Sequence, residues 1–483
     1  MWNPTAVSPL GPVYVAIADA LARDVAAGLL APGERLPTHR ALARELGVNV
    51  VTITRAYQEA ARRGLVEGEV GRGTFVRERE ERLLPGMPLI SQADEALIDL
   101  HVNSAACDVA VLDLPAELRR LADDGPLSDL LNTGYSPLGF ANHRVAGAAW
   151  IARSGLDADA ERVLITDGVQ HAMAVVLGAV LEPGDTLLVE ELTYAGVRAL
   201  AGMQRLKLAP LKMDAEGIDP AAFELACKKG LARALYVQPT VQNPTGAVMS
   251  EQRRARIAEL ARRYSLPVIE DDTCGYLLAN RPPPIASFYP ERTYHLCSTS
   301  KAIAPGLRVA YAHVPADAVE RVAANIAATV WMTAPLQAEL AARFIQSGRA
   351  DRVVEARRAE AAARRELFDA ILGDALAGSH SASNGHNGHE PRDASHAAGV
   401  SHPCAAHVWT PLPAPWRGTD FVEAARRAGV SVAPAEHFVV GRASAPHAVR
   451  LALGRPESRA DVERALRLLA GVLRDGPTCA SLV

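Results

Sequence analysis

The chain has 483 residues, 49% of them hydrophobic and 22% charged, which is ordinary for a globular protein of two or three domains. A formal net charge of −4 argues against nucleic-acid binding through the overall charge of the chain. The six cysteines are scattered without a CxxC pair, which indicates reduced thiols and neither a disulfide framework nor a zinc site. No signal peptide and no run of about 18 apolar residues is recognised, so we expect a cytoplasmic location without a membrane partner.

The first residues predict three helices. An amphipathic pattern runs from Val13 to Ala27, a second helix is expected from Arg40 to Leu46, and a third from Val50 to Arg63. Thr38 and Asn49 stand where N-caps are expected for the second and third helices. Two short helices joined by a turn that contains glycine indicate a helix-turn-helix.

Two short runs after the helices, Leu65–Glu67 and Gly73–Val76, predict the strands of a two-stranded wing. The segment 1–76 resembles the winged-helix DNA-binding domain of the GntR family. The motifs that carry the resemblance are Pro32-Gly33-Glu34-Arg35-Leu36-Pro37-Thr38-His39-Arg40, Leu42-Ala43, Leu46-Gly47-Val48, Thr52, Ala56-Tyr57 and Gly71-Arg72-Gly73-Thr74-Phe75-Val76.

The resemblance implies that the third helix enters the major groove of operator DNA and that the wing touches the minor groove or the backbone. Residues 1–80 carry ten arginines and nine acidic residues, so their charges must be segregated if one face is to bind DNA. The candidate DNA contacts are Arg35, Arg40, Asn49, Thr52, Arg55 and Arg72.

Residues 77–97 are interpreted as a linker, and residues 98–483 as a large α/β domain. Short apolar runs that predict buried strands lie at 163–166, 186–189, 234–237 and 267–270. Helical patterns near 169–181, 194–203 and 251–264 lie between them. This alternation predicts a largely parallel sheet with helices on both faces, whose ligands bind at the carboxyl ends of the strands.

Lys301 is one of only five lysines, and it follows an apolar run in Cys297-Ser298-Thr299-Ser300-Lys301. Lysine attacks an aldehyde when its amine is activated, and the hydroxyls of Ser298 and Ser300 with the guanidinium of Arg308 suit a phosphate. An aldehyde with a phosphate is pyridoxal 5'-phosphate (PLP). Asp271, at the end of a predicted strand, is a candidate partner for the ring nitrogen of PLP.

Three further motifs suit the same cofactor. Val169 and Gln170 open a helix directly after a strand and Gly168, where free N–H groups favour a phosphate. Asn243 offers an amide for the phenolate oxygen O3' of PLP, and Tyr194 offers a ring for stacking. Each of these motifs alone also fits a turn, a cap or a core residue.

Together these residues resemble fold-type I PLP enzymes, the class I and II aminotransferases, over about residues 98–475 with a small C-terminal α+β subdomain. The resemblance implies that Lys301 is the catalytic Schiff-base lysine and that Arg450 clamps a substrate carboxylate. It implies that Tyr135 reaches the phosphate of a neighbouring subunit. Cys274 departs from the pattern, because a tyrosine that bonds O3' is expected three residues after the pyridine-pairing aspartate. This departure predicts slow transamination, and Tyr276 replaces the phenol only if the backbone shifts.

An insertion is predicted at residues 374–404, low in apolar content, where His380, His386, His389, His396 and His402 gather. Its composition predicts a disordered surface loop, and a histidine-rich tract is also able to bind metal. The spacing fixes no ligand geometry, so no metal ligands are assigned.

A GntR-type winged helix joined to an aminotransferase-like domain is identified as the MocR subfamily of bacterial transcription regulators. This implies a domain-swapped, head-to-tail homodimer that binds operator DNA and senses a small amino-compound effector at a PLP site. Two alternatives stay open: an active aminotransferase with a vestigial DNA-binding head, and a regulator that senses PLP itself. The intact head favours a regulator, and Cys274 disfavours the enzyme.

Overall fold

The protein is described from a computed structural model, in which the chain divides into two compact units, Met1–Leu83 and Leu84–Val483. The division falls inside the predicted linker, of which residues 77–96 lie outside the described residues. The structure describes residues 2, 13–26, 30, 34–62, 65–69, 73–76, 97–105, 109–124, 126–132, 134–230, 232–377, 401–441 and 445–477.

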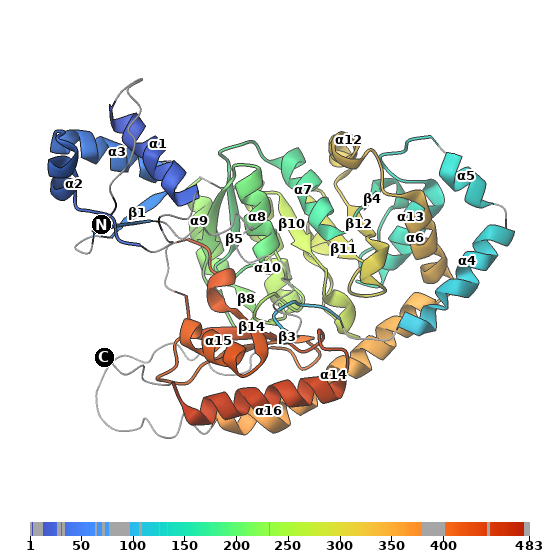
Figure 1. Ribbon diagram of the computed structural model, residues 1–483. Helices are drawn as coiled ribbons and strands as arrows, with labels where there is room; N and C mark the ends of the chain where they lie inside the picture. Colours follow the sequence, from blue (N-terminus) through green and yellow to red (C-terminus); the bar gives the residue numbers. More distant parts are fainter. Residues whose placement is uncertain are drawn as a thin grey trace. The chain divides into compact units, whose positions relative to one another are not determined.

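The first unit has the predicted three helices and wing (Figure 1). The helices α1 (Val13–Ala26), α2 (His39–Leu46) and α3 (Val50–Arg62) are followed by strands β1 (Val66–Glu69) and β2 (Gly73–Val76). The two strands pair antiparallel. Side chains from all three helices and both strands form one core, which includes Ile17, Leu42, Ile53, Val66 and Val76.

The second unit is built on a seven-stranded sheet in the order β4-β12-β11-β10-β9-β5-β6. All neighbouring pairs are parallel except those of β12, which runs antiparallel to both β11 and β4. The mainly parallel sheet is therefore confirmed, with one reversed strand. The bounds are β4 (Val163–Thr166), β5 (Thr186–Glu190), β6 (Lys207–Leu211), β9 (Ala232–Val237), β10 (Val268–Asp271), β11 (Thr293–Ser298) and β12 (Ala310–His313).

Helices cover both faces of this sheet. Strand β9 shows this, because successive side chains along a strand point to opposite faces. Ala234 and Tyr236 pack in the same core cluster as residues of α7 (Val169–Val180). Leu235 and Val237, on the opposite face, pack in a second cluster with Ile257 and Leu260 of α10 (Glu251–Arg263). The other helices around the sheet are α6 (Ala141–Ala152), α8 (Ala195–Met203), α9 (Pro220–Lys228), α12 (Val319–Val330) and α13 (Pro335–Gln346).

A smaller subdomain follows, with a four-stranded sheet in the order β13-β15-β14-β3. Its last strand comes from the start of the unit, so residues far apart in sequence complete one sheet. The strands are β3 (Ile98–Leu100), β13 (His407–Pro411), β14 (Val430–Pro434) and β15 (Ala448–Ala452), and the helices are α14 (Arg349–Ala377), α15 (Gly418–Arg427) and α16 (Arg459–Asp475). No helix in the described part of the chain is long and apolar enough to cross a membrane.

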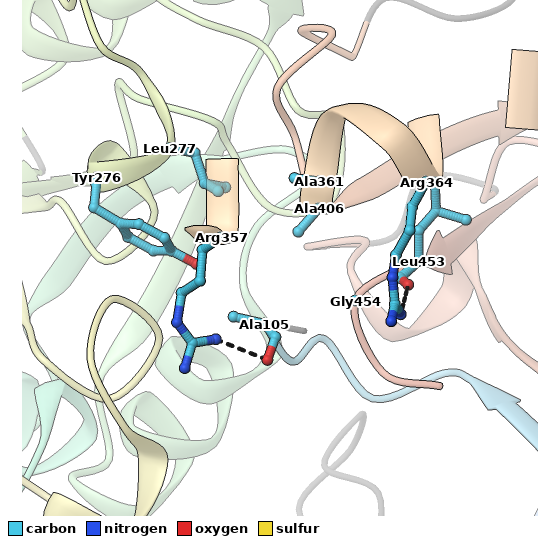
Figure 2. Close-up of a pocket in the computed structure, with 9 residues that line it drawn as sticks. All are labelled: Ala105, Tyr276, Leu277, Arg357, Ala361, Arg364, Ala406, Leu453 and Gly454. Carbon is cyan, nitrogen blue, oxygen red and sulfur yellow. Dashed lines mark hydrogen bonds between the residues drawn. The ribbon is translucent and has the colours of Figure 1, made fainter. Parts of the chain in front are cut away.

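The long helix α14 connects the large sheet with the smaller subdomain. Arg357 donates hydrogen bonds to the carbonyls of Ala105 and Ile303 at 2.8 and 2.9 Å, and Arg364 donates to Leu453 O at 2.8 Å. Figure 2 shows both arginines beside a small pocket. Its volume of about 10 Å³ suits one water molecule at most and excludes an organic ligand.

The predicted insertion is shorter than 374–404, because α14 continues through Ala377. The chain is described again from Ser401, whose hydroxyl donates to Thr245 O at 2.6 Å. Residues 378–400, with four of the five histidines, lie outside the described residues, so the predicted loop is described only at its ends.

Candidate functional site

A cavity of about 120 Å³ lies at the carboxyl ends of the strands of the large sheet, where the parallel order predicts a ligand site. All nine cofactor contacts that were expected from within this subunit line the cavity. They are Val169, Gln170, Tyr194, Asn243, Asp271, Ser298, Ser300, Lys301 and Arg308.

One end of the cavity is built to receive an anion. Gly168 precedes α7 with φ +83°, and a Cβ on it would lie 2.5 Å from Nη2 of Arg308. Arg308 itself is held at φ 51°, and its Nη1 donates to Oγ of Ser300 at 3.4 Å. The free N–H groups at the start of α7, one guanidinium and two serine hydroxyls therefore meet at one place, which suits a phosphate.

A buried carboxylate stands at the centre of the cavity. Oδ2 of Asp271 accepts hydrogen bonds from Tyr236 Oη and Gln238 Nε2, both at 2.8 Å. Oδ1 accepts from the backbone N–H and the hydroxyl of Thr273 at 3.0 and 2.5 Å. Four donors fix the orientation of this carboxylate at the end of β10, where it can partner a positively charged ring nitrogen.

Lys301 lines the cavity and is partly buried, between Ser300 and the buried Ala302. Cys274 is buried in the same wall, and burial raises the pKa of its thiol, against the lowering effect of the nearby Lys301 charge. The thiol therefore stays protonated at neutral pH. Tyr276 lines other cavities, so its phenol does not replace the tyrosine that is missing at Cys274.

Tyr194 lines the cavity as a partly buried ring. Burial, with the charge of Asp271, raises the pKa of its phenol to about 12, so the phenol stays neutral. A Cβ on Gly196 would lie 2.2 Å from the ring and 2.4 Å from Oε1 of Gln170. The absence of a side chain at Gly196 therefore leaves the space in which Tyr194 and Gln170 pack.

Arg450 lies at the edge of the cavity and does not line it. Its side chain is buried, its guanidinium lies 4.9 Å from the ring centre of Phe438, and Nη1 donates to Oδ1 of Asn243 at 2.7 Å. Burial lowers the pKa of Arg450 to about 10, which keeps it positive at neutral pH. The side-chain oxygen of Asn243 accepts a hydrogen bond from Arg450, so the Nδ2 group of Asn243 is left to donate to a ligand.

Tyr135 lies apart from the cavity of its own chain. Its side chain is 74% exposed, and its ring lies 5.2 Å from that of Trp331, which is itself 62% exposed. Two neighbouring exposed aromatic rings are unusual on a free surface.

Both helices of the helix-turn-helix in the first unit begin at the capping residues expected from the sequence. Oγ1 of Thr38 accepts from Ala41 N at 3.3 Å, and Oδ1 of Asn49 accepts from Val51 N at 2.9 Å. Gly47 ends α2 in the left-handed region at φ 64°, which permits the sharp turn into α3.

The expected DNA contacts that the structure describes are all at least partly exposed to solvent. On α3, Asn49 and Arg55 are exposed and Thr52 is half-buried, three residues apart each, so they share one face. The opposite face of α3 packs in the core. Arg35 and Arg40 are exposed as well, whereas Arg72 lies outside the described residues.

Several residues of the site were not expected from the sequence. Tyr236 and Gln238 on β9 and the loop after it, with Thr273, hold Asp271, and Met173 lines the cavity from α7. In the first unit, Arg44 is exposed one turn after Arg40. Gln238 and Thr273 follow the carboxyl ends of β9 and β10, and this position was a signal from which both residues could have been predicted.

The donor set fits PLP. An anion cradle, a fixed carboxylate, a stacking ring and a lysine amine are the four features that this cofactor requires of a protein. In addition, Oε1 of Gln170 in the cavity wall is buried without a hydrogen-bond partner, so the cavity also holds an acceptor for a donor group of a ligand other than the phosphate.

Comparisons with known proteins agree with both units. Residues 98–465 match the family of class I and II aminotransferases, and residues 13–76 match the gntR family of bacterial regulatory proteins. The chain is 30% identical to the uncharacterized HTH-type transcriptional regulator YdeF of Bacillus subtilis, over 98% of this chain and 97% of that protein. It is 28% identical to the HTH-type transcriptional regulator TauR of Rhodobacter capsulatus, over 72% of this chain and 77% of that protein.

Solved structures agree with the fold of the second unit. An archaeal alanine:glyoxylate aminotransferase superposes with a TM-score of 0.67 at 23% identity, covering 78% of this chain and 91% of that chain. N-succinyldiaminopimelate aminotransferase from Mycobacterium tuberculosis superposes with a TM-score of 0.63 at 26% identity, over 78% and 93%. The chain belongs to the GntR-family transcription regulators that carry a class I and II aminotransferase domain, an organisation consistent with the MocR subfamily.

Proposed function

We propose that this protein controls transcription in response to an amino compound that it recognises at a PLP site. Operator DNA would be bound by the solvent face of α2 and α3, and PLP would be held on Lys301. The observation that carries the proposal is the convergence of Lys301, Asp271 and Arg308 in one cavity of about 120 Å³.

Each residue has a separate part in holding the cofactor. Arg308, Ser300 and the first N–H groups of α7 would bind the phosphate, and Asp271 would hold a proton on the pyridine nitrogen. Tyr194 would stack on the ring, and Asn243 would donate to O3'. When bound, PLP supplies an aldehyde that captures amines and a ring that withdraws electrons.

The effector would be recognised through Arg450. An amino acid presents a carboxylate, and guanidinium binds carboxylate bidentately. In the structure the guanidinium already donates to Asn243 and to a backbone carbonyl, so a bound carboxylate would rearrange these hydrogen bonds. A ligand shifts the state of a protein only through such differences in contacts between two states.

A homodimer would complete the site. Tyr135 and Trp331 form an exposed aromatic pair, and Leu131, four residues before Tyr135, is 70% exposed. We propose that this surface meets a second copy and that Tyr135 reaches the phosphate bound by that copy. In a domain-swapped dimer two DNA-binding units would bind two half-sites, which gives a bipartite footprint.

The first experiment tests PLP attachment. Full-length protein is incubated with PLP, reduced with borohydride and digested for mass spectrometry, and the label is expected on Lys301. Lys301→Ala should carry no covalent PLP, while Lys207→Ala, a change at an exposed strand residue, should carry it as before. Covalent PLP that persists in Lys301→Ala would contradict the assignment.

The second experiment separates the regulator from its two alternatives. Footprinting on the chain's own promoter is compared without ligand, with PLP, and with PLP and a panel of amino compounds. A footprint that changes only when an amino compound is added supports the proposal. A response to PLP alone would identify a PLP sensor. The absence of any preference for the promoter, together with steady keto-acid production at about 1 per second or faster, would identify an aminotransferase instead.

A further inference from the structure

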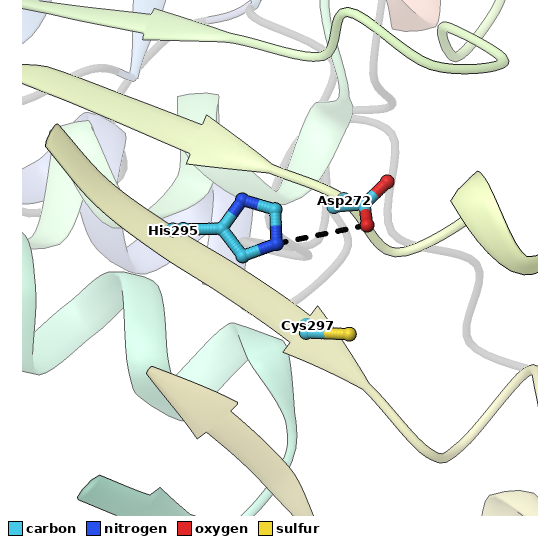
Figure 3. Close-up of side chains that lie close together, drawn as sticks. All are labelled: Asp272, His295 and Cys297. Carbon is cyan, nitrogen blue, oxygen red and sulfur yellow. Dashed lines mark ion pairs between the residues drawn. The ribbon is translucent and has the colours of Figure 1, made fainter. Parts of the chain in front are cut away.

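Strands β10 and β11 carry a second group of polar side chains, on the side away from the cofactor. Side chains alternate along a strand, and Asp271 and Ser298 line the cofactor cavity. Their neighbours Asp272 and Cys297 therefore point the other way, and His295 shares the face of Cys297 two residues earlier. Figure 3 shows these three side chains directed toward one another.

The three side chains are close enough to hold one metal ion. Asp272, His295 and Cys297 each offer one ligand atom, and these atoms lie within 4.8 Å of one another. Nε2 of His295 lies 3.7 Å from Oδ2 of Asp272. All three residues are at most 5% exposed, and Nε2 of His295 has no hydrogen-bond partner. A buried nitrogen without a partner is costly unless a ligand completes it.

A fourth residue, Glu270, orients the imidazole of His295 in the way that is usual for a histidine that binds a metal. Nδ1 of His295 lies 3.4 Å from Oε2 of Glu270, and Glu270 also accepts from the backbone N–H groups of Ile285 and Ala286 at 2.8 and 3.0 Å. A histidine that binds a metal usually donates its other ring N–H to a carboxylate, which fixes the tautomer. With Nδ1 directed to Glu270, Nε2 faces Asp272 and Cys297, and an ion that binds there would displace the proton from Nε2.

We propose that Asp272, His295 and Cys297 form a binding site for Zn²⁺ or a similar divalent transition-metal ion. One carboxylate, one imidazole and one thiolate are ligands that zinc accepts, and three protein ligands leave a fourth position open. That position would face a cavity of about 340 Å³, which Asp272 and Cys297 both line. The cavity gives the ion a route of entry and gives water or a small ligand room to bind it. This site was not expected from the sequence.

Arg281 competes with the ion for one ligand atom. Its Nη1 donates to Oδ2 of Asp272 at 2.7 Å. Oδ1 of the same carboxylate is buried without a hydrogen-bond partner, so a rotation of the side chain can offer one oxygen to the ion and keep the other for Arg281. Arg281→Gln should therefore bind the ion more tightly, because it removes a positive charge next to the site.

The test uses Co²⁺ as a spectroscopic substitute for Zn²⁺, because a thiolate ligand gives cobalt a charge-transfer absorption that imidazoles cannot supply. The background is the full-length chain with asparagine replacing the four histidines at 380, 386, 389 and 396, because a histidine-rich tract is able to bind metal by itself. After treatment with a chelator, one equivalent of Co²⁺ should produce the thiolate band. Cys297→Ser should abolish it, and Cys227→Ser, a change at another buried free cysteine, should not.

A second set of variants decides the matter if Cys297→Ser does not fold. Asp272→Asn and His295→Gln should weaken Zn²⁺ binding at least tenfold in competition with a chelating dye, and Glu270→Gln by about 10- to 100-fold. Circular dichroism checks that each variant is folded. The proposal is overturned if the folded parent protein gives no thiolate band, if the band survives in Cys297→Ser, or if these variants bind Zn²⁺ as the parent does. In those cases the cluster would bind no metal ion, and a protonated His295 would form ion pairs with Glu270 and Asp272.

Discussion

Arg450 of strand β15 donates a hydrogen bond to Oδ1 of Asn243 across 2.7 Å, which joins the smaller subdomain to the loop after β9. A ligand carboxylate that engages Arg450 must act on this hydrogen bond. If Arg450 and Asn243 act as proposed, the contact would connect effector binding, O3' recognition and the position of the smaller subdomain.

Replacing Arg450 with lysine keeps the charge but removes bidentate recognition of a carboxylate. We expect PLP loading of Arg450→Lys to be unchanged and its affinity for an amino-acid effector to fall about 10- to 100-fold, as for the loss of a charge-assisted hydrogen bond of about 1.5–3 kcal/mol. Spectral titration of the PLP-loaded protein measures this. An amine without a carboxylate is the control, and its affinity should be the same for both proteins. An equal loss for both ligands would show that Arg450 acts on the fold of the cavity instead.

Replacing Cys274 with tyrosine restores the phenol that related sequences are expected to carry. A phenol is a stronger hydrogen-bond donor than a thiol, so we expect single-turnover formation of keto acid from an amino acid to become faster. DNA affinity without effector should stay as it is, because Cys274 lies in the second unit. Stopped-flow spectroscopy and DNA-binding titration measure the two quantities. A rate that does not change in a folded Cys274→Tyr protein would mean that the thiol is not what limits turnover.

Replacing Arg40 with alanine removes one exposed cation from α2. As the loss of one phosphate contact, this should weaken binding to all DNA sequences alike and reduce the slope of log affinity against log salt by about one. Arg467→Ala, at a 70% exposed arginine of the second unit, should leave both quantities unchanged. A loss of affinity confined to the operator sequence would place Arg40 on a base and not on a phosphate.

Replacing His407 with glutamine should change how stability depends on pH. Burial, with the charge of Arg450, lowers the pKa of His407 to about 3. The unfolded chain takes up a proton on this histidine near pH 6.5 and the folded chain does not, so wild-type stability falls as pH decreases from about 6.5 toward 3. His407→Gln lacks this group and should lose less stability over that window. Denaturation midpoints of both proteins between pH 4.5 and 7.5 measure the difference; parallel profiles would contradict the assignment.

The sequence predicted those parts of the fold that depend on local patterns. Thr38 and Asn49 are helix caps because their short side chains reach the N–H groups of the next turn. Strands β6 and β12 were not predicted. Pro210 interrupts the apolar pattern of β6, and β12 is only four residues long and pairs antiparallel with β11 and with β4, which is remote in sequence.

The cofactor cavity was predicted from residues that follow strands, because parallel strands bring their carboxyl ends together. The hydrogen-bond network around Asp271 was not predicted, since Tyr236 lies within β9, where an aromatic residue is ordinarily part of the core. The cluster of Asp272, His295 and Cys297 was missed for a related reason. Asp272 is more than twenty residues from His295 and Cys297 in sequence, and only the pairing of β10 with β11 brings it to them.

Two arginines of α14 attach this helix to the large sheet at one point and to the smaller subdomain at another. Arg357 is anchored to the large sheet's side at Ile303, and Arg364 is anchored to the subdomain at Leu453 and Pro456. Seven residues, about two turns or roughly 10 Å of one continuous helix, separate the two anchors. A closing motion of the smaller subdomain would have to bend or twist this short stretch, and a proline placed there would interrupt the helix between the two anchors.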